Sequence, residues 1–183
     1  MNVLFLCTGN SCRSILAEAC FNHLAPAGWR ALSAGSQPTG QVHPRALALL
    51  AREGIAAQGC HSKSWDNLPA VPDVVVTVCA SAAGETSCPA YLGPVLRAHW
   101  GVDDPAHATG THAQMDAAFL AAYRTLRARI EAFLVLPLED LKTDPARLKA
   151  ELDRIGTLVG GGAALATVEP QSASASCSGG ACC

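Results

Sequence analysis

Residues 7–14 combine a thiol, a guanidinium and a hydroxyl at a spacing suited to attack on an oxyanion. They read Cys-Thr-Gly-Asn-Ser-Cys-Arg-Ser, the pattern Cys-x5-Arg-Ser. A loop that closes onto a helix N-terminus turns backbone N–H groups toward an anion. Arg13 adds a planar bidentate donor, and this positive field favours the thiolate of Cys7. The predicted oxyanion-binding residues are Thr8, Gly9, Asn10, Ser11, Cys12 and Arg13.

The segments on either side of this loop predict how it is held. Residues 2–6 are an apolar run typical of a buried strand, and residues 14–24 carry apolar side chains at helical spacing. Cys7 then leaves a strand, and the Ser14 hydroxyl opens a helix where it can donate to the sulfur. The pattern predicts a cysteine nucleophile facing a bound oxyanion. The alternative is a buried strand-end cysteine with Arg13 on a helix surface.

Strands and helices alternate along the rest of the chain, which predicts an α/β fold with a parallel sheet. Residues 73–78 give the clearest strand, because they are β-branched without alternation. Further strands are predicted at 29–33 and 96–100, and helices at 43–53, 111–136 and 138–155, the last interrupted near Pro145. We expect one domain over residues 1–156 and a flexible Gly/Ser/Cys-rich tail over 157–183.

Composition excludes several classes of protein. The 183 residues carry a net charge of −2, so nothing favours binding to nucleic acid or an anionic membrane surface. No apolar stretch is long enough to span a bilayer, and residues 3–7 are too short for a signal-peptide core. A cytoplasmic protein is therefore expected, and there nine cysteines point to catalysis, redox chemistry or metal binding rather than structural disulfides.

Residues 3–18, Val-Leu-Phe-Leu-Cys-Thr-Gly-Asn-Ser-Cys-Arg-Ser-Ile-Leu-Ala-Glu, resemble the opening of the low-molecular-weight tyrosine phosphatase superfamily. That superfamily also contains the thioredoxin-coupled arsenate reductases. The resemblance extends to about residue 156. It implies a three-layer α/β fold with a four-stranded parallel sheet flanked by helices, and an arsenate or phosphate-like substrate.

Residues near 104 carry the acid that this resemblance implies. Asp104-Pro105 matches the acid loop of the family, so Asp104 would protonate the departing oxygen, with Asp103 as the adjacent alternative. Tyrosine phosphatases of the family carry aromatic residues just after this Asp-Pro. Ala106 and His107 stand there instead, which disfavours an aryl phosphate substrate.

A second pair of thiols favours a reductase. Cys79 ends the strand at 73–78, and Cys88 follows in a segment of small residues before Pro89. This pair resembles the redox loop of the arsenate reductases. The implied reaction is a relay: Cys7 attacks arsenate, Cys79 attacks Cys7 and releases arsenite, and Cys88 then attacks Cys79. Thioredoxin or glutaredoxin would reduce the last disulfide, with no tightly bound cofactor.

Cys12 departs from the reductase pattern, since reductases often have another residue there. It is a candidate for a protective disulfide with Cys7, or for intercepting the arsenic adduct. Our hypothesis is that Cys12 is dispensable for turnover.

Some reductases of the family bind potassium beside the anion loop. Asn10, Glu18 and Ser33 match positions that would line such a site. No aspartate stands near residues 62–64, where a fourth ligand is expected, and Lys63 is a candidate to supply the positive charge instead.

Two other functions remain open from the sequence. One is a phosphatase that uses Cys7, Arg13 and Asp104 alone. The other is a non-enzymatic arsenite- or metal-binding protein, because thiolates favour soft ions and three cysteines lie near the C-terminus. These are Cys177, Cys182 and Cys183.

Overall fold

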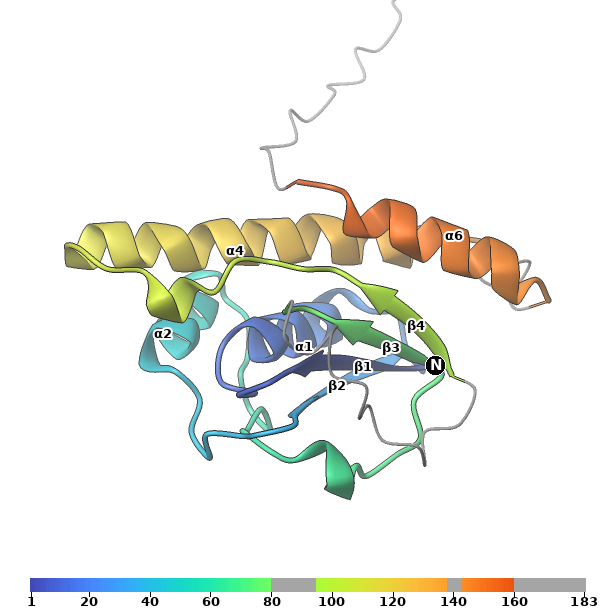
Figure 1. Cartoon of the computed structure of the whole chain (residues 1–183), viewed down its shortest axis with the longest axis horizontal. Coiled ribbons are helices and arrows are strands. Elements are labelled where there is room, and N and C mark those ends of the chain that lie inside the picture. Colours follow the sequence, from blue (N-terminus) through green and yellow to red (C-terminus); the bar gives the residue numbers. More distant parts are fainter. Residues whose placement is uncertain (80–94, 138–142, 160–183) are drawn as a thin grey trace, which may run out of the picture.

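A parallel four-stranded sheet forms the centre of the protein, with strand order β2-β1-β3-β4 (Figure 1). The computed structural model describes residues 1–79, 95–137 and 143–159. The strands are β1 (Asn2–Cys7), β2 (Arg30–Gly35), β3 (Val74–Thr77) and β4 (Leu96–His99). All four lie where the sequence predicted a strand, so the predicted parallel sheet is confirmed.

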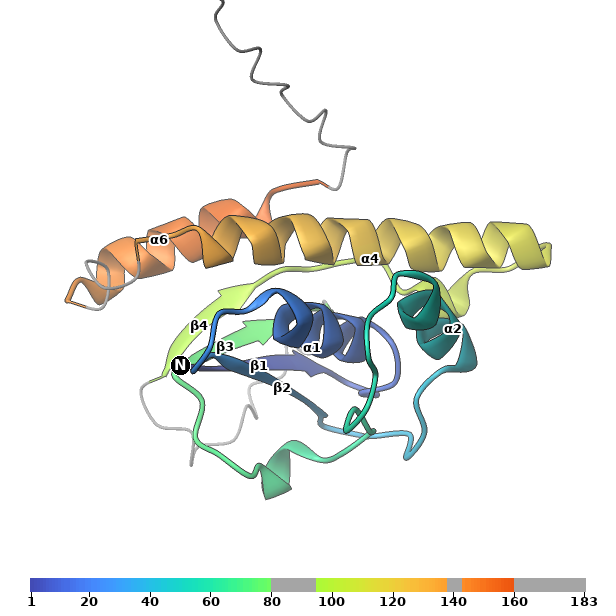
Figure 2. The same ribbon diagram turned by 180° about the vertical axis from the view of Figure 1, so that it is seen from behind.

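Helices α1, α4 and α6 lie on one side of this sheet, as both views of the ribbon show (Figures 1 and 2). The described helices are α1 (Arg13–Leu24), α2 (Pro44–Arg52), α4 (His112–Leu134) and α6 (Pro145–Gly156), with 3-10 turns η1 (Trp65–Asn67) and η3 (Pro105–His107). None of the described helices is long and apolar enough to cross a membrane.

Both faces of β1 are buried, as expected for a central parallel strand. Val3 and Phe5 belong to the larger apolar core that the helices cover, and the ring of Phe5 lies 6.1 Å from that of Trp100. Leu4 and Leu6 join a smaller core on the opposite face. Burial on both faces fixes the register of the strand and hence the position of Cys7 at its end.

The carboxyl ends of β1, β3 and β4 meet at one edge of the sheet. Leu6 pairs with Thr77, and the Val78 N–H donates to the Leu6 carbonyl at 2.9 Å. Beyond β4, the Val102 N–H donates to the Val78 carbonyl at 3.1 Å. The residues that follow β1, β3 and β4 therefore lie close together, although they are far apart in the sequence.

The interruption predicted near Pro145 within the helix over 138–155 is confirmed. Residues 138–142 lie outside the described residues, and Thr143 and Asp144 are not helical. Helix α6 begins at Pro145 because the Asp144 side chain accepts from the Arg147 N–H at 3.0 Å and caps the first turn. The tail predicted from residue 157 is described only as far as 159.

Candidate active site

Cys7 ends β1 with its sulfur surrounded by hydrogen-bond donors. The Asn10 N–H donates to Cys7 Sγ at 3.1 Å, and Ser14 Oγ lies 3.0 Å from the same sulfur. The Asn10 side-chain amide donates to Ser14 Oγ at 2.9 Å. When Cys7 is a thiolate the sulfur has no proton to give, so the Ser14 hydroxyl is the donor. Both contacts stabilise negative charge on the sulfur.

The loop of residues 7–14 turns its carbonyls outward. The carbonyls of Thr8, Gly9 and Ser11 accept from backbone N–H groups of the segment that follows β2. These donors are Gln37 at 2.9 Å, Thr39 at 3.0 Å and His43 at 2.9 Å. In a trans peptide the N–H points opposite to the carbonyl, so the N–H groups of residues 9, 10 and 12 point away from that segment, and the Asn10 N–H meets Cys7 Sγ. Backbone N–H groups turned to one side of a loop are what an anion-binding nest requires.

Gly35 allows β2 to approach this loop closely. A Cβ at position 35 would lie 2.4 Å from the Thr8 carbonyl oxygen and 2.9 Å from that of Cys7. The sequence analysis missed this requirement, although a glycine that ends a strand next to the predicted loop is a visible signal. Asn10 is the one non-glycine with positive φ (41°) among the described residues, and asparagine tolerates that conformation.

Arg13 and Asp104 lie face to face across the mouth of the loop. Arg13 Nη2 contacts Asp104 Oδ2 at 2.5 Å, and Nη1 donates to the Val102 carbonyl at 2.9 Å. The Asp104 carboxylate also caps η3, since Oδ1 accepts from the Ala106 N–H at 3.1 Å. The structure thus brings together the predicted anion clamp and the predicted acid.

One donor of Arg13 has no partner. Its Nε is the only buried side-chain nitrogen or oxygen of the described residues without a hydrogen bond. Leaving such a group unpaired is costly, which makes it a site where a ligand acceptor is expected. A tetrahedral oxyanion in the adjacent nest would supply that acceptor.

Cys12 lies in the loop but is poorly suited to act as a nucleophile. It is buried, and its Sγ lies 3.6 Å from Asp104 Oδ1, where the thiol donates. Burial, and next the charge of Asp104, raise the pKa of Cys12 to about 12. The protonated thiol therefore predominates near neutral pH.

Cys79 lies beside the nucleophile loop. It follows β3, the strand that pairs with β1, and its Sγ is 3.7 Å from the hydroxyl of Thr8, the residue next to Cys7. Cys79 is buried, as is Cys7. Adjacent parallel strands bring Cα atoms within the range that a disulfide needs. Cys88, the third predicted thiol, lies outside the described residues.

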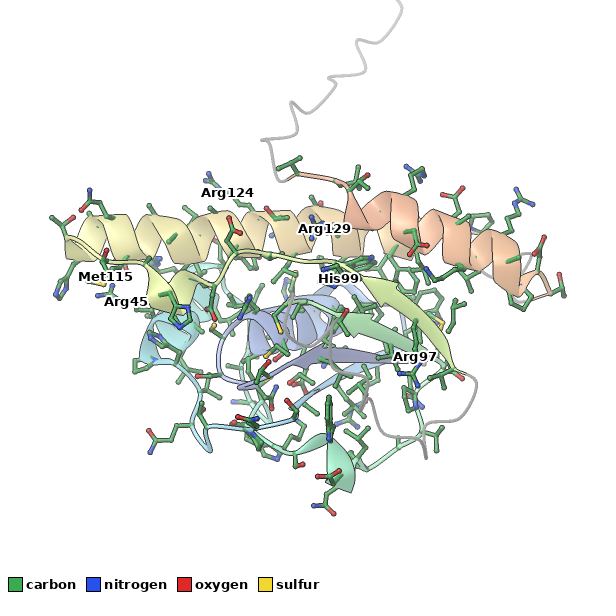
Figure 3. The ribbon with its side chains drawn as sticks, in the orientation of Figure 1. Arg45, Arg97, His99, Met115, Arg124 and Arg129 are labelled. Carbon is green, nitrogen blue, oxygen red and sulfur yellow. The ribbon has the colours of Figure 1, made fainter. Side chains whose placement is uncertain are left out.

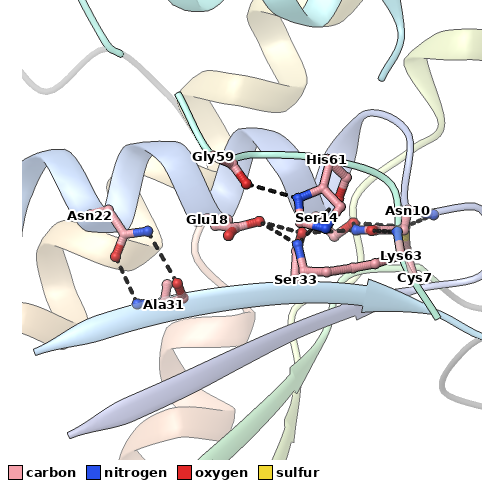
Figure 4. A network of polar contacts seen from close by, with 10 residues as sticks. All are labelled: Cys7, Asn10, Ser14, Glu18, Asn22, Ala31, Ser33, Gly59, His61 and Lys63. Atoms are coloured by element: carbon pink, nitrogen blue, oxygen red, sulfur yellow. Dashed lines mark hydrogen bonds and ion pairs between the residues drawn. The ribbon is translucent and has the colours of Figure 1, made fainter. Parts of the chain in front are cut away.

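The residues predicted to line a cation site form one buried network with Lys63 (Figure 4). Ser33 donates to Glu18 at 2.5 Å and accepts from the Asn10 amide at 2.8 Å. Lys63 Nζ lies 3.5 Å from the same Glu18 oxygen. Within the described chain, no group of three or more His, Cys, Asp or Glu residues is arranged to hold a metal ion.

Arg129 holds the segment that carries Asp104, a role that the sequence analysis missed. From α4 it reaches the chain beyond β4 (Figure 3), where Nη1 donates to the Gly101 carbonyl at 3.1 Å and Nε to the Leu158 carbonyl at 2.9 Å. An arginine between Leu126 and Ile130 on the apolar side of a predicted helix was the available signal.

A parallel sheet whose first strand ends in a cysteine, followed by an anion nest and an arginine, defines a cysteine-dependent phosphatase-like fold. The family model described as low molecular weight phosphotyrosine protein phosphatase matches residues 2–147. The chain belongs to that family, and its fold is the one the resemblance implied.

Curated relatives of this chain carry a more specific name than the family does. A protein named arsenate reductase from Shouchella clausii is 37% identical over 136 residues, covering 72% of this chain and 93% of the relative. An arsenate reductase from Bacillus subtilis is 36% identical over 132 residues, with the same coverage.

Solved structures of both kinds resemble the chain. A structure described as an arsenate reductase in the phosphate binding state is 28% identical, with a TM-score of 0.60, covering 73% of this chain and 95% of that one. A low molecular weight protein tyrosine phosphatase from T. tengcongensis is 26% identical, with a TM-score of 0.57, covering 72% and 95%. The fold alone therefore does not separate reductase from hydrolase.

Proposed function

We propose that the protein is an arsenate reductase that transfers two electrons from its own thiols to arsenate. The observation that carries this proposal is Cys79, a second cysteine whose Sγ lies 3.7 Å from the hydroxyl of Thr8, the residue next to Cys7. A hydrolase needs no such thiol, because water completes its reaction. The names of the curated relatives support the same choice.

In the first step the Cys7 thiolate attacks arsenic. The loop N–H groups and Arg13 hold the oxyanion, and the unpartnered Nε of Arg13 gains its acceptor. A sulfur–arsenic bond forms, an arsenic–oxygen bond breaks, and the oxygen leaves as water with a proton from Asp104. Arsenic is still pentavalent at this point.

In the second step a Cys79 thiolate attacks the sulfur of Cys7. A disulfide forms between the two residues, the sulfur–arsenic bond breaks, and its electron pair stays on arsenic. Arsenite is released, and the two sulfurs are oxidised by two electrons together. The adjacent, parallel pairing of β1 with β3 supports this step.

Cys88 then attacks Cys79, which frees the Cys7 thiolate and moves the disulfide to the Cys79–Cys88 pair. A dithiol protein such as thioredoxin or glutaredoxin reduces that disulfide by the same exchange chemistry. Such carriers act in a reducing compartment, so a cytoplasmic enzyme belongs to the proposal.

The second candidate is a phosphatase that uses Cys7, Arg13 and Asp104. The pairing of clamp and acid at 2.5 Å and the likeness to a tyrosine phosphatase structure favour it. However, Ala106 and His107 stand where tyrosine phosphatases of the family carry the aromatic residues that contact an aryl ester. We expect phosphatase activity only as a weak side reaction.

The test is arsenate-dependent NADPH oxidation in the presence of thioredoxin and its reductase. The wild-type enzyme is expected to turn over, Cys79→Ser and Cys88→Ser to stop, and the control Cys60→Ser to match wild type. Inert wild-type protein that hydrolyses an aryl phosphate, with Cys79→Ser hydrolysing equally well, would instead establish the phosphatase.

A further inference from the structure

Glu18 is a buried carboxylate on α1, 6% exposed, and it needs compensation for its charge. Two groups compensate this charge, and both contact the same carboxylate oxygen of Glu18. The Ser33 hydroxyl donates to Glu18 Oε2 at 2.5 Å, and Lys63 Nζ lies 3.5 Å away. The Lys63 ammonium also donates to the His61 carbonyl at 3.2 Å, which fixes its direction. Lys63 therefore places an ammonium group beside the buried carboxylate.

The charge of Glu18 sets the direction of the hydrogen bonds that lead to the nucleophile. A carboxylate only accepts, so the Ser33 hydroxyl proton points to Glu18 and an oxygen lone pair remains for the Asn10 amide at 2.8 Å. The Lys63 backbone N–H donates to Asn10 Oδ1 at 2.8 Å. These two contacts fix which end of the Asn10 amide carries the nitrogen.

The oriented amide then acts on the nucleophile. Its nitrogen donates to Ser14 Oγ at 2.9 Å, and Ser14 Oγ lies 3.0 Å from Cys7 Sγ. When Cys7 is a thiolate, the Ser14 hydroxyl proton points to the sulfur while a lone pair of the hydroxyl oxygen accepts from Asn10. Each hydrogen bond in this series, from Glu18 to Cys7, then has an assigned donor. Asn10, Ser14 and Ser33 are fully buried.

We propose that the ammonium of Lys63 takes the place of a bound potassium ion beside Glu18 and positions the donors of Cys7. The residues present do not fit a potassium site, because the charged ligand Glu18 already faces an ammonium. The oxygens of Asn10 and Ser33 are likewise engaged with protein donors. Lys63 is thus a positioning residue, since it acts on the nucleophile only through others.

A pocket next to the pair makes the proposal testable by substitution. It has a volume of about 390 Å³ and is lined by Glu18 and Lys63 together with Arg30 and His61. Removing the Lys63 ammonium would leave the Glu18 carboxylate uncompensated at the wall of an open pocket. A small cation added to the solution could then reach it.

The first measurement uses wild-type enzyme and needs no variant. The rate of Cys7 alkylation by iodoacetamide and the melting temperature are compared in potassium chloride and in choline chloride at equal ionic strength. We expect no difference in either. A several-fold potassium effect on the alkylation rate, or a clear potassium-dependent rise in melting temperature, would overturn the proposal.

The second measurement compares Lys63→Met with the control Lys149→Met, a lysine on α6 whose side chain is 43% exposed and pairs with Asp153. We expect Lys63→Met to slow Cys7 alkylation about tenfold in choline and to regain much of the rate in potassium, with a rise in melting temperature. Glu18→Gln added to Lys63→Met removes the charge that attracts potassium, so the rescue should vanish. A Lys63→Met protein as reactive as the control in choline would refute the role.

Lys63→Arg keeps the positive charge, and it provides the test if the Lys63→Met protein does not fold. It should react like wild type and ignore potassium, whereas potassium-dependent reactivity in it would count against the proposal. The inference about Lys63 rests on the proposed function only where arsenate turnover is the measured quantity. Alkylation and melting do not involve arsenate, so failure of arsenate reduction would leave this test intact.

Discussion

Arg13 and Asp104 form a 2.5 Å ion pair at the mouth of the nucleophile loop. The pair joins two residues that come from distant parts of the chain, one at the start of α1 and one beyond β4. It occupies one of the nitrogens of Arg13 that an oxyanion would otherwise contact, while Nε stays unpartnered. Substrate binding must therefore share Arg13 between the substrate and Asp104.

This sharing predicts opposite effects of Asp104→Asn on binding and on chemistry. The neutral amide competes less for Arg13, so inorganic phosphate should bind more tightly, as measured by isothermal titration calorimetry. Loss of the proton donor should slow arsenate turnover by about 10²- to 10⁴-fold. Asp103→Asn is the matched control and should leave both quantities near wild type. Weaker phosphate binding in Asp104→Asn would contradict this account of the pair.

Cys12→Ser should turn over arsenate at a rate close to wild type. Burial and the charge of Asp104 raise the pKa of Cys12 to about 12, so its thiol contributes little thiolate near neutral pH. Mass-spectrometric mapping of iodoacetamide labelling at pH 8 should find Cys7 modified well before Cys12. A Cys12→Ser enzyme that has lost arsenate reduction would place Cys12 in the relay.

Ser14 and Ser33 should behave as parts of one unit. Ser14→Ala removes the hydroxyl beside Cys7, and Ser33→Ala removes the anchor of the Asn10 amide that directs it. Each single variant should slow Cys7 alkylation. The double variant should be less impaired than the product of the two effects, with a coupling of about 0.5–3 kcal/mol. Fully additive effects would show that the two hydroxyls act separately.

The alkaline stability of the fold should depend on Cys20. Burial raises the pKa of this core thiol from 9.0 to about 12. Above pH 9 the unfolded chain loses the proton while the folded chain keeps it, so stability falls as pH rises toward 12. The slope from this one group is about 1.4 kcal/mol per pH unit.

The measurement is urea unfolding at several pH values from 8 to 11 with Cys20→Ala and wild type. The variant should show a shallower loss above pH 9. Cys60→Ala is the comparison, because burial raises the pKa of Cys60 only to about 11. Parallel stability curves for Cys20→Ala and wild type would argue against a neutral buried thiol.

The sequence alone predicted the four strands and the nucleophile loop because both depend on local signals. The loop lies in residues 7–14, and an unbroken β-branched run marks β3. The Glu18, Ser33 and Asn10 cluster was expected from the family resemblance, and the structure brings these residues together. Their roles in the reaction stay predictions.

Other parts of the site depend on contacts that the residue types do not predict. The loop carbonyls are held by backbone N–H groups of Gln37, Thr39 and His43, and any non-proline residue there could donate equally. The contact of Arg13 with Asp104 needs the register of β3 against β4, which the sequence does not specify. Such long-range pairings are set by tertiary packing.

The central claim is that Cys79 resolves the arsenic adduct on Cys7, and a single turnover of Cys88→Ser tests it most directly. With no third thiol to carry the disulfide away, one equivalent of arsenate should give one equivalent of arsenite. Peptide mass mapping should then find a Cys7–Cys79 disulfide. Arsenite formation without that disulfide, or equal arsenite from a Cys79→Ser/Cys88→Ser double variant, would contradict the account.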